Sequence, residues 1–174
     1  MIIINKHVLS ILVENNSGVL SRIAGLFSRR GFNIDSLTVS TTDTMNISRI
    51  TITVTGDDYI LEQITKQLNK LIPVIKVTEL KPTQAVFRDL ILVKIKPQKD
   101  DLSYINDLVK VYRGNIIDFS KETITIELTG DSDKISAFLS VIDNYPIVEL
   151  VRTGITGIQR GNINLIDKST TKNI

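Results

Sequence analysis

The chain has 174 residues, of which 42% are hydrophobic and 23% charged, a composition typical of a globular protein with one domain or two small ones. Its 21 basic and 19 acidic side chains leave a formal net charge of +2, which does not give the strongly basic surface typical of nucleic-acid binding. Cysteine is absent, and this excludes disulfides, thiolate metal sites and a cysteine nucleophile.

The first half of the chain opens with a strand, a helix and a second strand. Residues 7–13 are apolar on both faces, as in a central strand. Residues 18–30 have the periodicity of an amphipathic helix, and Gly31 is a suitable residue to end it. In the strand expected at 33–42 the apolar positions change phase, which indicates a bulge or an edge strand.

A third strand, a second helix and a fourth strand complete this half. Positions 50–55 alternate strictly, so we expect their isoleucine and valine side chains to face the core and their threonines to face outward. The next helix begins after Gly56-Asp57-Asp58 and ends before Pro73. Its apolar stripe consists of Leu61, Ile64, Leu68 and Leu71. With a strand at 74–80 the order is βαββαβ, the ferredoxin-like arrangement.

The same order of elements recurs in the second half. Its expected strands are residues 89–96, 115–119, 123–129 and 147–153, and its expected helices are residues 100–112 and 132–144. The letters also recur: Arg30-Gly31-Phe32-Asn33-Ile34-Asp35 is echoed by Arg113-Gly114-Asn115-Ile116-Ile117-Asp118, and Thr55-Gly56-Asp57 by Thr129-Gly130-Asp131. We therefore predict an α+β fold of two tandem ferredoxin-like units.

The predicted domains follow from this repeat. The first covers residues 5–80 and the second residues 88–161, with a linker at 81–87 and a tail at 162–174.

The turn between the first strand and the first helix is the clearest candidate for a ligand site. It reads Glu14-Asn15-Asn16-Ser17-Gly18, and these residue types favour a strand-to-helix turn. A helix that opens there presents free backbone N–H groups, which can bind a carboxylate or a phosphate. The same residues can also form a turn and a helix cap and nothing more. The second unit has Pro97-Gln98-Lys99-Asp100-Asp101 at this place, and its acids would repel an anion.

Other kinds of site have weaker support. His7 is the only histidine and has no neighbouring ligand in the sequence, so metal binding and general-base chemistry lack a second residue. Gly18, Arg22 and Asn33 resemble the phosphate cradle of acylphosphatases, although Asn15 stands where that family has a further glycine. An RNA-binding sheet needs outward aromatic side chains, and the third strand has threonines.

Several longer runs carry a family resemblance. They are Glu14 to Gly18, Leu26 to Ile34, Ser36 to Val39, Leu92 to Ile95, and Arg152-Thr153-Gly154 to Arg160-Gly161. From about His7 to Gly161 the chain resembles the small regulatory subunits of acetolactate synthase (acetohydroxyacid synthase), whose N-terminal unit is an ACT domain. The expected tail from Asn162 has no counterpart in this family pattern.

This resemblance implies a non-catalytic chain that acts in the biosynthesis of valine, leucine and isoleucine. Such a chain binds and activates a large catalytic subunit, which carries thiamine diphosphate, magnesium and FAD, and it has no cofactor or metal of its own. It forms a homodimer through its ACT domains and binds valine between them for feedback inhibition. Neither nucleic acid nor a membrane is an expected partner.

The resemblance also implies the residues of the effector site. Those that contact the amino acid would be Asn15, Gly18 and Asn33, and those that line the pocket Ser17, Val19, Leu20 and Ile34. The residue types suit this role, because an amino acid needs N–H donors for its carboxylate, amide oxygens for its ammonium group and an apolar wall for its side chain.

Two alternatives to this function stay open on the sequence: a free-standing ACT sensor of amino acids and an acylphosphatase-like hydrolase. The apolar run at residues 1–4 is too short for a signal peptide or a membrane span, and no transit segment is visible. We therefore expect a bacterial cytoplasmic protein or a protein of the plastid stroma.

Overall fold

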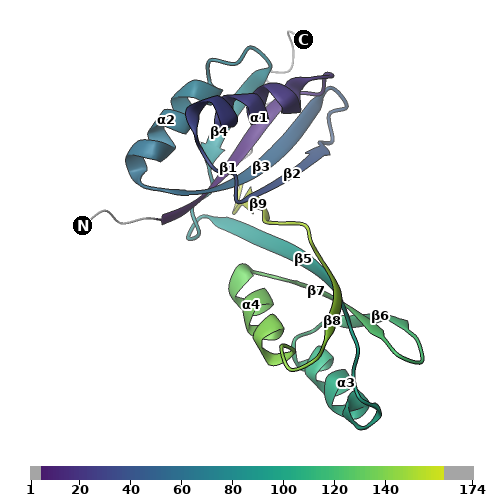
Figure 1. The fold of residues 1–174 in the computed structure, drawn as a ribbon. Helices are drawn as coiled ribbons and strands as arrows, with labels where there is room; N and C mark the ends of the chain where they lie inside the picture. Colours follow the sequence, from purple (N-terminus) through teal and green to yellow (C-terminus); the bar gives the residue numbers. More distant parts are fainter. Residues whose placement is uncertain (1–4, 163–174) are drawn as a thin grey trace. The chain divides into compact units, whose positions relative to one another are not determined.

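A computed structural model describes residues 5–162, without the side chain of Lys99 (Figure 1). The described chain forms two compact units. Unit 1 contains residues up to 86 together with those from 156 onward, and unit 2 contains residues 87–155. None of the helices in this described part is long and apolar enough to cross a membrane.

Unit 1 is a four-stranded antiparallel sheet with two helices. Its elements are β1 (Asn5–Glu14), α1 (Val19–Arg30), β2 (Ser36–Thr41), β3 (Ile47–Gly56), α2 (Asp58–Leu68) and β4 (Val74–Glu79). The strand order is β2-β3-β1-β4, so the predicted βαββαβ fold is confirmed. As expected, β1 is central and β2 lies at an edge. The register between β2 and β3 is continuous, so the phase change in the sequence reflects the late start of β2 and not a bulge.

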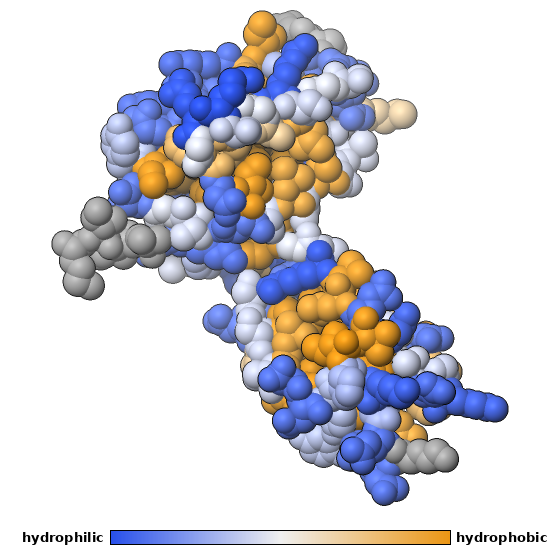
Figure 2. All heavy atoms as spheres, in the orientation of Figure 1, coloured by the Kyte–Doolittle hydropathy of each residue, from blue (hydrophilic) through white to orange (hydrophobic). Residues whose placement is uncertain are grey.

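The core of unit 1 lies between its helices and one face of the sheet. Leu9 and Ile11 of β1 and Ile23 of α1 are fully buried there. Phe27 packs edge-on against Phe32, with ring centroids 6.2 Å apart. Figure 2 shows hydrophobic residues gathered in the middle of this unit and bordered by hydrophilic ones.

The other face of this sheet is less exposed than the alternation in β3 suggests. Ile50, Ile52 and Val54 face the core as predicted, but the threonines expected to point outward are not all accessible. Thr51 and Thr53 are only 1% and 0% exposed. One reason is local pairing, because the Ser36 hydroxyl donates to Thr53 Oγ1 at 2.8 Å. Periodicity assigns a side chain to a face but does not reveal what covers that face.

Unit 2 repeats the arrangement. Its elements are β5 (Ala85–Ile95), α3 (Leu102–Val111), β6 (Asn115–Phe119), β7 (Ile124–Gly130), α4 (Ser132–Val141) and β8 (Ile147–Arg152), with a short 3-10 turn η1 (Lys99–Asp101) before α3. The strand order is β6-β7-β5-β8, which matches unit 1. A separate core lies beneath α3 and α4, where Phe138 packs edge-on against Tyr112 with centroids 5.3 Å apart.

The ends of unit 2 differ from the expected pattern. Strand β5 begins at Ala85, inside the predicted linker, and a short strand β9 (Thr156–Gln159) that the sequence did not predict pairs with β5. Arg160 also binds the start of β5, because its backbone N–H donates to Gln84 O at 2.8 Å and its Nε donates to Ala85 O at 3.1 Å. Residues from 156 therefore group with unit 1 in their contacts. The predicted tail from 163 onward lies outside the described residues.

Candidate functional site

The turn that follows β1 has the form expected of an anion site. Gly18 is the N-cap of α1 and has a left-handed backbone with φ 83°, which glycine adopts without steric strain. No side chain caps the helix, and its first turn contains no acidic residue. The N–H of Arg22 bonds to Gly18 O at 3.0 Å, whereas those of Leu20 and Ser21 come before the first regular helical hydrogen bond. These amides are available to a carboxylate.

Asn15 fixes this turn to the neighbouring strand connection. Its backbone N–H donates to Asn46 O at 2.8 Å, and its side-chain Nδ2 donates to Met45 O at 3.2 Å. The side-chain oxygen of Asn15 has no partner among residues 5–162, so it can accept a hydrogen bond from an ammonium group. Ser17 is exposed and Leu20 is 40% exposed.

Asn33 and Ile34 lie in the loop between α1 and β2. The side-chain Nδ2 of Asn33 donates to Asp35 Oδ1 at 3.0 Å, and the Thr55 hydroxyl donates to Asp35 Oδ2 at 2.6 Å. Ile34 is half-buried against the core. Val19, at the other end of α1, is only 5% exposed and belongs to the core itself.

Within one chain the seven residues predicted to bind the effector form two groups and not one pocket. Asn15 lies beside the start of β3, whereas Asp35, the partner of Asn33, bonds through its N–H to Thr53 O near the end of β3. The six steps from Ile47 to Thr53, at about 3.3 Å per residue, separate the two groups by roughly 20 Å. The structure therefore does not bring Asn15 and Asn33 together in a single copy.

The other candidates from the sequence have structural explanations. His7 is buried and its Nδ1 lies 2.9 Å from Glu79 Oε1, so the imidazole is part of a pair between β1 and β4. No group of three metal-binding side chains occurs among the residues that the structure describes. At the start of α3, Asp100 and Asp101 stand in the η1 turn, where a carboxylate ligand would meet negative charge.

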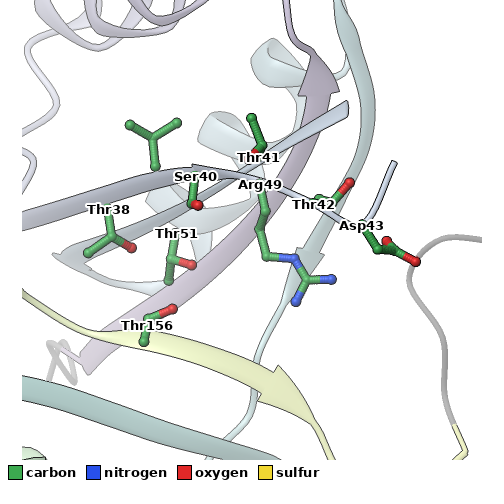
Figure 3. Close-up of a pocket in the computed structure, with 9 residues that line it drawn as sticks. Thr38, Ser40, Thr41, Thr42, Asp43, Arg49, Thr51 and Thr156 are labelled. Carbon is green, nitrogen blue, oxygen red and sulfur yellow. The ribbon is translucent and has the colours of Figure 1, made fainter. Parts of the chain in front are cut away.

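A polar cavity of about 320 Å³, which no sequence pattern indicated, lies beside β2 (Figure 3). Hydroxyl side chains from β2 and β3 line it together with the guanidinium of Arg49. Its members are spread over residues 38–51 and Thr156, and only the pairing of β2 with β3 gathers most of them. Alternating threonines and serines with one arginine form no recognisable motif in the sequence.

Comparisons with known proteins cover both units. Residues 9–76 match the family model described as the AHAS small subunit-like ACT domain, and residues 88–161 match the one described as the small subunit of acetolactate synthase. The chain belongs to the acetolactate synthase small-subunit family. Members of this family are regulatory and not catalytic, which removes the support for an acylphosphatase-like hydrolase.

Individual relatives extend over nearly the whole chain. A probable acetolactate synthase small subunit of Methanothermobacter thermautotrophicus is 52% identical, covering 91% of this chain and 95% of the relative. The small subunit of acetolactate synthase isozyme 3 of Salmonella typhimurium is 46% identical, covering 90% of this chain and 97% of the relative. A crystal structure of the Thermotoga maritima small subunit, 42% identical, has a TM-score of 0.85 and covers 91% of this chain and 99% of that one. As a small subunit, the chain associates with a large subunit.

Proposed function

We propose that this chain binds valine between two ACT units of a homodimer, confers feedback inhibition on the large catalytic subunit, and also activates that subunit. The observation that carries the proposal is the opening of α1, where Gly18 leaves backbone amides free and no acidic side chain stands in the first turn. A valine carboxylate fits this opening. Asn15 and Leu20 offer an amide oxygen and an exposed apolar surface for the ammonium group and the side chain.

The separation of the two residue groups supports a site shared by two copies. Strand β2 is an edge strand, and an edge strand has backbone groups free for pairing with a second copy. Antiparallel pairing of two β2 strands about a two-fold axis places opposite ends of the two sheets side by side. In that arrangement Asn15 and Gly18 of one copy lie beside Asn33 of its partner. The effector then contacts two chains and can alter their relative placement.

Such a site binds reversibly and discriminates weakly. An apolar wall separates side chains that differ by one methylene by about 1–3 kcal/mol, so leucine and isoleucine should bind more weakly than valine without exclusion. Allosteric coupling of about 1–3 kcal/mol is typical, and it is enough to weaken the activating contact with the large subunit.

Thermal melting of the purified chain tests whether the effector binds. At about one hundred times its dissociation constant, valine should stabilise the chain by about 2.7 kcal/mol, while lysine should not. Leucine and isoleucine should give smaller rises in the midpoint at equal concentration. Absence of any rise with all three would contradict the proposal.

Two asparagine variants test the residues and the division of roles. With the large subunit present, Asn15→Ala should lose inhibition by valine and keep the activation. Asn16→Ala is the matched control, because Asn16 is an exposed neighbour whose Nδ2 donates only to Glu14 Oε2, at 3.0 Å. If Asn15→Ala lost both effects, the residue would be structural. If the unmodified chain bound valine without affecting the large subunit, it would be a free-standing sensor.

A further inference from the structure

The polar cavity beside β2 is separate from the proposed valine site. Register places Thr38 of β2 opposite Thr51 of β3, and Ser40 opposite Arg49. The core residues Ile50 and Ile52 alternate with these positions, so the four side chains lie on the sheet face away from α1 and α2. The cavity, of about 320 Å³, is therefore on the other side of the sheet from the first turn of α1.

The cavity lining contains several hydrogen-bond donors. Figure 3 shows the Arg49 side chain extending from β3, with the hydroxyl-bearing Ser40 and Thr51 on one side and Thr156 of β9 across from it. Hydroxyl groups and a guanidinium together can surround an oxygen-rich ligand, since each donates to an acceptor oxygen. Val39 and the threonine methyl groups add apolar surface to the same lining, beside these donors.

Among the described residues that line the cavity, Arg49 has a buried hydrogen-bond donor without a partner. It is half-buried, and its Nε is fully shielded from solvent with no hydrogen-bond partner among the described residues. A buried donor on a charged group that lacks a partner is destabilising by more than a neutral one. A bound oxyanion would satisfy it, because a guanidinium offers Nε and Nη donors in the fork that matches two oxygens.

The charges near the cavity agree with an anion. Asp43 is the one acidic residue of the described lining, and in Figure 3 its carboxylate points away from the Arg49 guanidinium. Neither residue forms an ion pair within residues 5–162. On the same sheet face, Leu12 pairs with both Arg49 and Lys76, which places the lysine backbone about 10 Å from that of the arginine. The local field therefore favours negative charge.

We propose that this cavity is a second ligand site, which binds a small oxyanion, a phosphate or carboxylate group, through the Arg49 guanidinium and the hydroxyls of Ser40 and Thr51. Arg49 supplies the charge and the paired donors, and the hydroxyls complete the shell of the remaining oxygens. The site uses none of the residues proposed to hold valine.

Nuclear magnetic resonance of the full-length chain tests this directly. Inorganic phosphate, succinate and valine are titrated separately at constant ionic strength, and the Hε–Nε signal of Arg49 is followed. Phosphate or succinate should shift this signal saturably. The anion with the lower dissociation constant shows whether the site prefers a phosphate or a carboxylate group. Arg49→Gln should weaken binding about tenfold or more, as expected when a charge-assisted hydrogen bond is lost.

Two variants serve as controls. Arg22→Gln removes an exposed arginine of α1 and should leave binding of the anion unchanged. Asn15→Ala should affect valine and not the anion. The proposal is overturned if neither anion shifts the Arg49 signal, or if Arg49→Gln folds and binds the anion as well as the unmodified chain. A shift of that signal by valine alone would also overturn it, and would place the effector in this cavity.

Discussion

At the scale of single residues, the two units end their first helix with different left-handed residues. Helix α1 ends at Gly31, whose φ of 68° is left-handed, but at the end of α3 the left-handed residue is Arg113, with φ 53°. The sequence echo of Arg30-Gly31 in Arg113-Gly114 marks a helix end in both units, but the left-handed residue is the glycine of the first pair and the arginine of the second. Gly114 has another role, since its missing side chain allows β7 to approach closely.

Alanine at Gly114 and at Gly130 should therefore have unequal effects. A Cβ at Gly114 would lie 2.9 Å from the backbone oxygen of Glu127, which cannot move without disturbing β7. We expect Gly114→Ala to lower the free energy of unfolding by about 1–3 kcal/mol. At Gly130 the obstacle is Lys134 Cδ, at 2.6 Å, part of a flexible side chain, so Gly130→Ala should cost about 0.5 kcal/mol. Urea denaturation of both variants measures this order, and the reverse order would refute the packing argument.

At the scale of elements, the sequence was most informative where periodicity and capping agree. The helix after Asp57 was predicted with a cap from Gly56-Asp57-Asp58, and Gly130-Asp131 echoes that pattern before the next helix. The Asp57 and Asp131 carboxylates each accept from the third backbone N–H of their helix, at 2.8 Å. Strand β9 was missed because its four residues, Thr-Gly-Ile-Gln, are too few to show alternation. The cavity at Arg49 was missed because it depends on pairing between strands, which no local pattern encodes.

The aspartate cap of α2 should contribute measurably to stability. Asp57→Ala removes the acceptor for the Ile60 N–H, so the free energy of unfolding should fall by about 1 kcal/mol. Asp57→Asn keeps an acceptor oxygen at the same place and should lose much less. Chemical denaturation compares the two variants, and an equal loss in both would mean that the charge of Asp57 and not its hydrogen bond stabilises the helix.

At the scale of the whole molecule, two separate cores determine how the chain responds to the truncation of a buried side chain. Phe27 and Phe138 are the largest buried side chains of units 1 and 2, and each has its own aromatic partner. The residues proposed to bind the effector are likewise divided between opposite ends of one sheet, and in the proposed homodimer a second copy brings them together. The sequence could name those residues by family resemblance, but their separation became visible only through the register of β3.

Truncation of a buried phenylalanine in one core should leave the other unit protected from hydrogen exchange. Phe138→Ala should lower the free energy of unfolding of unit 2 by about 3–5 kcal/mol, through lost burial and the cavity that remains. Native-state hydrogen exchange should then become faster in β5 to β8 and remain slow in β1, β3 and β4. Phe27→Ala should give the converse pattern. Equal acceleration in both units would show that the two cores unfold as one.

The pairing of β9 with β5 has a consequence for the order in which the protein is made. Unit 1 contains the beginning of the chain and also residues from 156 onward, so it cannot be complete until unit 2 has left the ribosome. About 70 residues separate the two segments, and at about 5–20 residues per second their synthesis takes roughly 4–15 s. During that interval the four strands of the first sheet are already present, but unit 1 still lacks the segment from residue 156, and a chaperone that recognises nascent chains would meet it in this state.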